Sequence, residues 1–130
     1  MKIQIIQIKE NDINTIVTGI TEAGIIKGIW NYNEKPIIGK EYYVELDIDK
    51  INANDIEIFQ GKEYEVSLIK DELIFKVKCD SIDTDSVYSF RLGKSIFLIE
   101  IANDKHIINL NDFVTFKIDY NHIRIFPYEY

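Results

Sequence analysis

Residues 42–49 read Y-Y-V-E-L-D-I-D, and this stretch decides the fold class of the chain. Apolar or aromatic residues occupy the even positions, whereas a tyrosine and three acids occupy the odd positions. Successive side chains of a strand point to opposite faces, so this period of two predicts a strand that is buried on one side. Its exposed side is predicted to carry the row Tyr43, Glu45, Asp47 and Asp49.

The same alternation continues along most of the chain, and helical periodicity is nearly absent. Residues 73–79, 88–92 and 114–118 alternate in this way and are separated by turn-forming residues. We therefore predict an all-β fold with little or no helix: an antiparallel β-sandwich or partly open barrel of about ten short strands built from meander hairpins. The alternative is a five-stranded oligonucleotide-type barrel with an added sheet.

Three segments give more local predictions. Residues 2–9 change the parity of their isoleucines between Ile5 and Ile6, which predicts a β-bulge or a strand that passes between two faces. Residues 96–101 are almost continuously apolar, which is typical of a central strand covered on both faces. Residues 107–110 are predicted to form the strand that returns after it.

The size of the chain indicates one compact β domain spanning residues 1–130, with a mass of 15.3 kDa. Two internal similarities suggest a weak organisation into 1–60 and 61–130. The sequence G-K-E-Y occurs at 39–42 and 61–64, and the strand pattern of 44–59 resembles that of 116–126. The two similarities have different offsets, so we favour reuse of a strand pattern over a duplication.

The charge balance restricts the kind of partner. The net charge is −7 and the sequence pI is about 4.8, which is opposite to the basic footprint of nucleic-acid-binding proteins. We therefore expect neither nucleic acid nor an anionic membrane as partner, and an acidic surface suits a basic protein.

Several features indicate a cytoplasmic bacterial protein. No apolar run approaches the roughly 18 residues of a membrane span, and no cleavage site follows the N-terminal isoleucines. The single cysteine, Cys79, fits a reducing compartment. The chain has 27 isoleucines but only 3 alanines and 2 arginines, a bias typical of low-GC bacterial genomes.

Candidate catalytic groups lack partners at a useful spacing. His106 and His122 both fall near turns; whether they meet in one site is left open, and exposed turn residues are the simpler interpretation. The acidic stretches 47–55 and 80–85 do not match a calcium-binding loop. Cys79 has the apolar parity of its strand, which predicts a buried thiol. We expect no enzyme activity, no metal and no cofactor.

Aromatic residues beside carboxylates are typical of protein interfaces, in which tyrosines provide anchors and charges guide the partner. The row Tyr43, Glu45, Asp47 and Asp49 is therefore the predicted partner-binding face. The most concrete hypothesis is a non-catalytic immunity- or antitoxin-type inhibitor that covers the basic active-site surface of a toxin with this acidic, tyrosine-bearing face.

Two other functions are compatible with the sequence. A ligand- or oligomer-binding barrel module would have a pocket lined by Trp30 and Tyr32. A phage or structural assembly subunit would associate through exposed edge strands. The sequence does not fix the oligomeric state.

Overall fold

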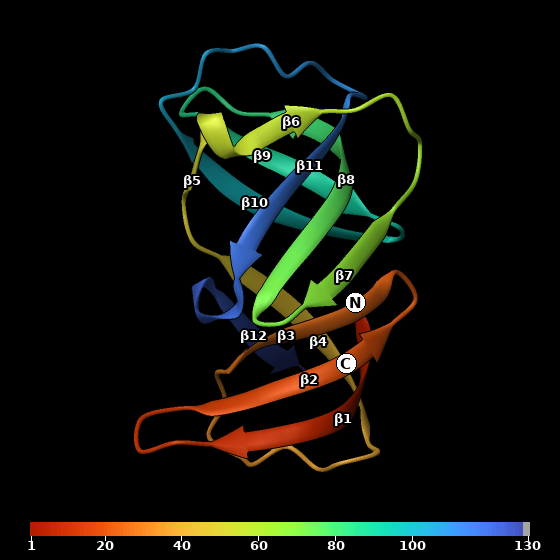
Figure 1. The fold of residues 1–130 in the computed structure, drawn as a ribbon, viewed down its shortest axis with the longest axis vertical. Coiled ribbons are helices and arrows are strands. Elements are labelled where there is room, and N and C mark those ends of the chain that lie inside the picture. Colours follow the sequence, from red (N-terminus) through yellow and green to blue (C-terminus); the bar gives the residue numbers. More distant parts are fainter. Residues whose placement is uncertain (129–130) are drawn as a thin grey trace.

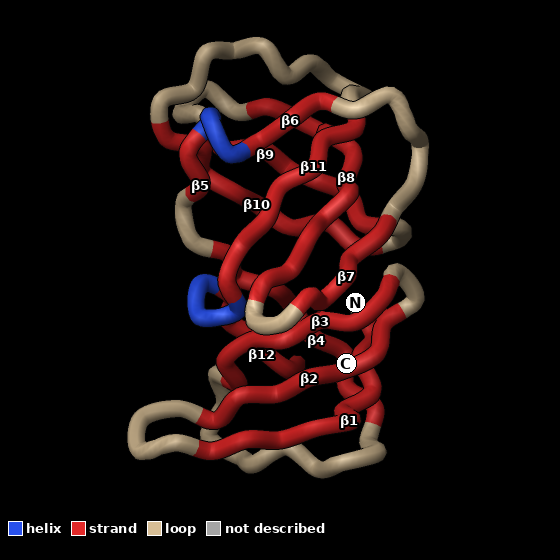
Figure 2. Tube along the Cα trace, in the orientation of Figure 1, coloured by secondary structure: helices blue, strands red, loops and turns tan. Residues whose placement is uncertain are grey.

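The computed structural model describes residues 1–128, which form twelve β-strands and two short 3-10 helices, so the all-β prediction is confirmed. Strands dominate the trace and the helical turns are brief (Figure 2). Among the residues described, no helix has the length and apolar character needed to cross a membrane.

The elements follow in chain order as β1 (Lys2–Glu10), β2 (Thr15–Thr21), β3 (Gly24–Trp30), β4 (Glu41–Ile48), β5 (Ile51–Asn52), η1 (Ala53–Asp55), β6 (Ile56–Ile58), β7 (Glu65–Ile69), β8 (Glu72–Ile82), β9 (Val87–Leu92), β10 (Ser95–Ala102), β11 (Phe113–Asp119), η2 (Tyr120–His122) and β12 (Ile123–Tyr128).

Burial follows the alternation of the sequence. In β4, Val44 and Ile48 are buried, whereas Glu45 and Asp47 face solvent. The predicted bulge in β1 is confirmed, because the register between β1 and β2 shifts between Ile5 and Gln7.

Five strands form a closed barrel in the order β12-β4-β1-β2-β3, with β12 also pairing in parallel with β3. This barrel is the lower part of the molecule in Figure 1. Its last strand comes from the opposite end of the chain. The first four strands therefore complete their barrel only when the C-terminal strand returns to them.

Five of the remaining seven strands repeat this connection order; β5 and β7 are the other two. The five are arranged as β6-β11-β8-β9-β10, in which β6 comes from the first half of the chain. Thus β12, which follows β11, pairs with β4, while β6, which follows β4 and β5, pairs with β11. Each group of strands is thus completed by a strand, β12 or β6, that follows the other group's strands in the sequence.

Strands β6 and β12 are each preceded by a short 3-10 turn, and the two turns are similar in sequence. Residues 50–59 (K-I-N-A-N-D-I-E-I-F) and 117–126 (K-I-D-Y-N-H-I-R-I-F) are identical at 6 of 10 positions. In each, the side chain of Asn52 or Asp119 accepts a hydrogen bond from the backbone amide two residues later, at 2.9 Å in both cases, and so caps a 3-10 turn.

The two turns also lie against each other. A recess of about 310 Å³ between them is lined by four positions from each segment. These are Lys50 with Lys117, Ile51 with Ile118, Asn52 with Asp119, and Asp55 with His122.

The G-K-E-Y similarity has no structural counterpart of this kind. Tyr42 lies within strand β4, whereas Tyr64 lies in the segment before β7.

Two strand predictions were wrong. Strand β10 is not covered on both faces: Ile96 is 50% and Leu98 59% exposed, because no described element packs over them. Residues 107–110 form no strand but belong to the 103–112 loop. The φ angles of Asn103, His106 and Asn111 are positive, and such residues cannot continue the extended backbone of a strand.

The paired strands form an almost complete ring from β4 through β1, β2, β3, β7, β8 and β9 to β10. Strand β5 continues from β4 and pairs with β10 only at Ile101 and Ala102. Residues 44–48 of β4 and 95–100 of β10 are not paired with each other; we call the gap between them the seam. Both strands are drawn fainter, at the back of the view in Figure 1.

Strands β3 and β7 pair at Gly24, whose φ is +138° and whose partner is Val66. We expect Gly24→Ala to lower the free energy of unfolding by about 3 kcal/mol or more, because its Cβ would overlap the carbonyl oxygen of Val66. Gly93→Ala is the control: its φ is +64° but its Cβ would meet no atom within 4 Å. It should cost about 1–2 kcal/mol. Urea denaturation measures both, and equal losses would contradict this packing.

Candidate functional site

The predicted partner-binding row lies on the outer face of β4. Tyr43, Glu45 and Asp47 are exposed, whereas Asp49 lies just beyond the strand and is half-buried. The ring of Tyr43 lies 6.3 Å from that of Tyr128 on β12. Phe126, which pairs with Glu45 across the two strands, is 36% exposed. The acidic row is therefore part of a wider surface with aromatic character.

Two of its carboxylates are held by the neighbouring strand. Arg124 donates from Nε to Asp47 at 3.0 Å and from a terminal nitrogen to Asp49. His122 Nδ1 lies 3.0 Å from the other oxygen of Asp49. The hydrogen bond from Arg124 is the main cause that lowers the pKa of Asp49 below its ordinary value of 3.8; burial opposes it and His122 supports it.

This ion-pair network reduces the negative charge that the row shows to solvent. Glu45 belongs to none of the salt bridges found among residues 1–128, although it interacts with the N-terminal ammonium group of Met1. Burial lowers the pKa of that ammonium group, and Glu45 partly offsets the effect. Glu45 is therefore the carboxylate of the row that is best placed to meet a partner.

An aromatic pocket of about 420 Å³ adjoins the row. Its walls are the aromatic residues Trp30, Tyr32, Tyr42, Tyr43 and Tyr128, the apolar residues Ile37 and Pro127, and the charged residues Glu34, Lys35, Lys40 and Glu41. The structure thus brings the predicted Trp30 and Tyr32 into one wall. Tyr43 belongs both to the row and to the pocket.

Local contacts fix the pocket floor. The indole Nε1 of Trp30 donates to the carbonyl oxygen of Glu34 at 2.8 Å, and its ring meets Tyr42 edge-on at 5.0 Å. The hydroxyl of Tyr42 accepts a hydrogen bond from the Ile37 amide at 3.0 Å. Lys40 Nζ lies 5.0 Å from the centre of the Tyr42 ring. The rings are therefore held in place, and one of them already attracts a cation.

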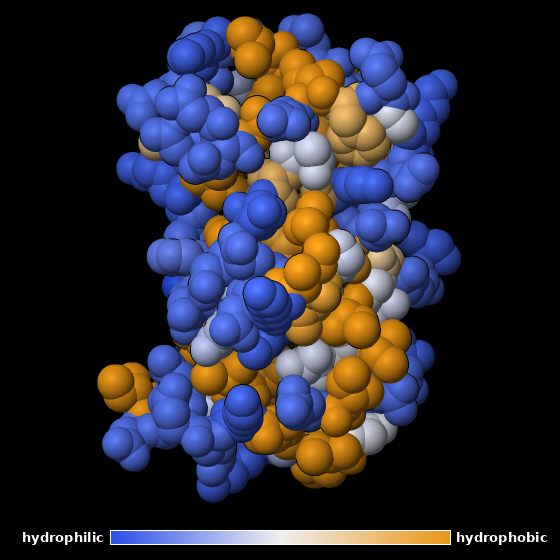
Figure 3. Space-filling model, viewed as in Figure 1, coloured by the Kyte–Doolittle hydropathy of each residue, from blue (hydrophilic) through white to orange (hydrophobic). Residues whose placement is uncertain are grey.

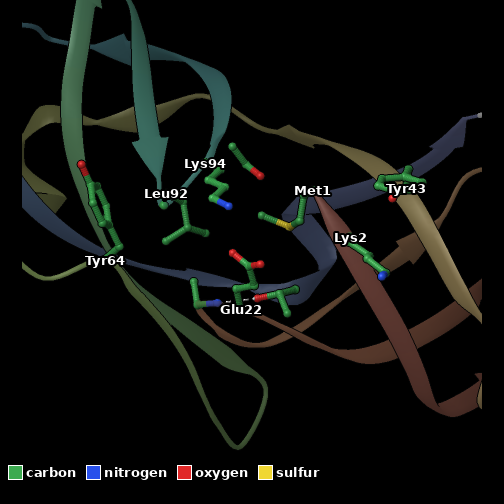
Figure 4. Close-up of a pocket in the computed structure, with 11 residues that line it drawn as sticks. Met1, Lys2, Glu22, Tyr43, Tyr64, Leu92 and Lys94 are labelled. Atoms are coloured by element: carbon green, nitrogen blue, oxygen red, sulfur yellow. Dashed lines mark hydrogen bonds between the residues drawn. The ribbon is translucent and has the colours of Figure 1, made fainter. Parts of the chain in front are cut away.

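A second hollow, of about 430 Å³, lies at the wide end of the seam (Figure 4). It is lined from the barrel by Met1, Lys2, Glu22 and Tyr43, and from the other strands by Tyr64, Leu92 and Lys94. Tyr43 therefore borders both hollows. Its lining includes both basic and acidic side chains, so its charge selects neither a cationic nor an anionic ligand.

The alternative sites of the sequence are not assembled here. His106 Nδ1 lies 3.4 Å from Asp104, and His122 pairs with Asp49 instead. The 103–112 loop lies at one end of the molecule and η2 near its middle, as the blue colours of Figure 1 show. Among residues 1–128, no group of three or more His, Cys, Asp or Glu side chains is placed to hold a metal ion.

The prediction of a buried thiol at Cys79 is confirmed, since the residue is 0% exposed. Burial raises the pKa of this thiol to about 11, and the nearby Asp112 and Asp80 act in the same direction. The thiol is therefore kept protonated, which disfavours a role as a nucleophile.

The sequence did not reveal the basic residues that pair with the acidic row. Arg124 and His122 lie more than 70 residues from their carboxylate partners, at separations of 75 and 73. Only the resemblance between 44–59 and 116–126 pointed to a connection between these regions. Tyr42 was assigned to the buried face and not to a pocket.

No protein-family model matches this chain, and neither curated proteins nor solved structures show a significant similarity to it. The fold and the surface geometry therefore define an all-β protein with a closed five-stranded barrel and an aromatic pocket beside an acidic strand.

We expect Arg124→Ala to raise the pKa of Asp49, because the main stabilising partner of the carboxylate is removed. A lowered pKa in the folded state stabilises the protein above pH 3.8, and this contribution is lost as the pH falls through the lowered value. The difference in unfolding free energy between wild type and variant should therefore shrink between neutral and strongly acidic pH.

Carboxyl NMR titration and denaturation at several pH values check this prediction. Arg91→Ala is the matched control, because Arg91 pairs with Asp80 at 3.1 Å on another surface. It should leave the pKa of Asp49 unchanged. An Asp49 pKa that is the same in wild type and Arg124→Ala would show that the network does not govern this carboxylate.

Proposed function

We propose that this chain is a non-catalytic binding module for a basic protein partner. The observation that carries the proposal is the adjacency of an acidic strand face and an aromatic pocket, which share Tyr43. Such a surface offers ring faces for anchoring and a carboxylate, Glu45, for pairing with a basic residue.

The pocket chemistry favours a cationic side chain. Aromatic rings attract lysine or arginine through their electron-rich faces, by about 0.5–2 kcal/mol per contact. Lys40 already illustrates this attraction at the ring of Tyr42. A lysine or arginine of a partner would find further exposed rings in Tyr32 and Tyr43. The wall also carries two acidic and two basic residues, Glu34, Glu41, Lys35 and Lys40.

The overall charge supports the same class of partner. A net charge of −7 on 130 residues guides basic proteins toward the surface and repels nucleic acid. The most concrete form of the proposal is an immunity- or antitoxin-type inhibitor that covers a basic active-site surface. Acidity, small size and the Tyr43–Glu45 surface support this form.

A small-molecule-binding module is the second candidate, favoured by the volume of the pocket. About 420 Å³ falls within the range of roughly 300–1,000 Å³ that is usual for ligand sites. A neutral aromatic ligand would bind with little dependence on salt and would be insensitive to charge reversal at Glu45.

Fluorescence of Trp30, the single tryptophan, reports on the pocket directly. We expect a short blocked peptide that alternates lysine and valine to change this fluorescence, and binding to weaken as salt rises. The glutamate–valine peptide of equal length should not bind. Tyr43→Ala and Glu45→Lys should each weaken binding at least about fivefold.

Glu57→Lys is the matched control. Glu57 is exposed on β6, and its replacement by lysine changes the net charge by the same amount as Glu45→Lys. It should reduce binding much less than Glu45→Lys. Equal effects of the two charge reversals, or equal binding of the acidic peptide, would refute the proposed function.

A further inference from the structure

The side of β10 that faces the seam has backbone groups without strand partners. The Ile101 amide donates to Ser86 at 2.9 Å, on the side of β9. Hydrogen-bonded and non-hydrogen-bonded pairs alternate along an antiparallel ladder, so the amides of Ile96 and Leu98 point away from β9. Within residues 1–128, no strand pairs with this edge between Ser95 and Glu100.

The facing edge of β4 is also open beyond the start of β1. Val44 exchanges hydrogen bonds with Met1, at 2.7 Å and 3.2 Å, on the side of β1. By the same alternation, the amides of Leu46 and Ile48 point to this side. The register between β1 and β4 covers only Lys2–Gln4, and no described strand continues it.

The side chains of β10 beside the seam are unusually apolar for an exposed edge. Ile96 and Leu98 are 50% and 59% exposed and flank the unpaired amides. Exposed apolar residues are ordinary on protein surfaces, and Figure 3 shows that the opposite face carries them too. A long apolar edge without pairing is different, because it is a template for strand addition.

The molecule itself shows what fills such a gap. In the shared connection order, β4 corresponds to β11 and β10 corresponds to β3. Strand β8, which corresponds to β1, pairs with β11 over Phe113–Asp119 as β1 pairs with β4, and β7 then joins β8 to β3. Among residues 1–128, no strand between β1 and β10 corresponds to β7, so the seam is the place of this one strand.

We propose that the seam accepts an extended segment of the basic partner, which adds as a strand to the open edge of β10. This proposal rests on the proposed function and specifies the conformation that the partner adopts. Backbone pairing with Ile96 and Leu98 would supply affinity that does not depend on side-chain identity.

The lining of the seam specifies the composition of that segment. A hollow of about 400 Å³ in the seam is bordered by Val44, Leu46 and Phe97, which are apolar, and by one acidic and one basic residue, Glu45 and Lys94. Inward side chains of the segment should therefore be apolar, and a lysine or arginine should lie near Glu45. Tyr128 borders both this hollow and the aromatic pocket, so one partner can contact both.

The test compares the blocked lysine–valine peptide with the same peptide carrying N-methyl groups on alternate amides, which cannot pair along one edge. Binding is followed by fluorescence anisotropy of labelled peptide on the intact protein. We expect N-methylation to weaken binding at least about tenfold, since it removes backbone hydrogen bonds. Leu98→Pro, which removes one seam-facing amide without touching the β9 ladder, should weaken the unmodified peptide similarly.

Leu98→Lys provides a second variant in case the proline disturbs folding, because an edge lysine blocks strand addition. Ile69→Lys is its matched control: Ile69 is 58% exposed on β7, away from the seam. Unchanged binding in Leu98→Lys, or no effect of N-methylation, overturns the strand-addition proposal even if Tyr43→Ala still weakens binding. Loss of a self-associated dimer in Leu98→Lys would also overturn it, because the occupant is then a second copy. No binding of any basic peptide refutes the proposed function itself.

Discussion

The return of β12 to the N-terminal half is the interaction on which the rest of this structure depends. It pairs with β4 along its length and with β3 at Arg124 and Ile125, and so closes the barrel. Its residues Ile123 and Ile125 are 0% exposed, and burial of each such side chain is worth about 1.5–3 kcal/mol. Because β6 makes the reciprocal crossing, neither group of strands is complete without the other.

The same pairing determines the chemistry of the surface. Strand β12 brings Arg124 and His122 to the carboxylates of β4, so an acidic sequence becomes a partly neutralised ion-pair network. Glu45 and Tyr43 remain beside the aromatic pocket. Since β12 occupies one edge of β4, the other edge is left to β1, whose short register opens the seam toward β10. The acidic, aromatic surface and the seam are therefore consequences of the same strand arrangement.

Local features of the fold could be read from the sequence, and long-range ones could not. Alternation within 42–49 predicted β4, and the parity change at Ile5 predicted the bulge, because both depend on neighbouring residues. The pairing of Arg124 with Asp49 depends on topology and has no local signal. The apolar run 96–101 predicted a strand correctly but not its exposure, since coverage depends on what lies beside it.

Backbone hydrogen exchange at Ile96 and Leu98 shows whether the unfilled edge of β10 accepts a strand from a basic partner, as we propose. Exchange of individual amides reports on the hydrogen bonding of each residue. In the free protein these two amides should exchange fast, while Phe97 and Ile99, whose amides face β9, are protected. A saturating basic peptide should slow Ile96 and Leu98 and leave the other two unchanged. Equal, fast exchange of Ile96 and Leu98 with and without bound peptide would contradict strand addition at this edge.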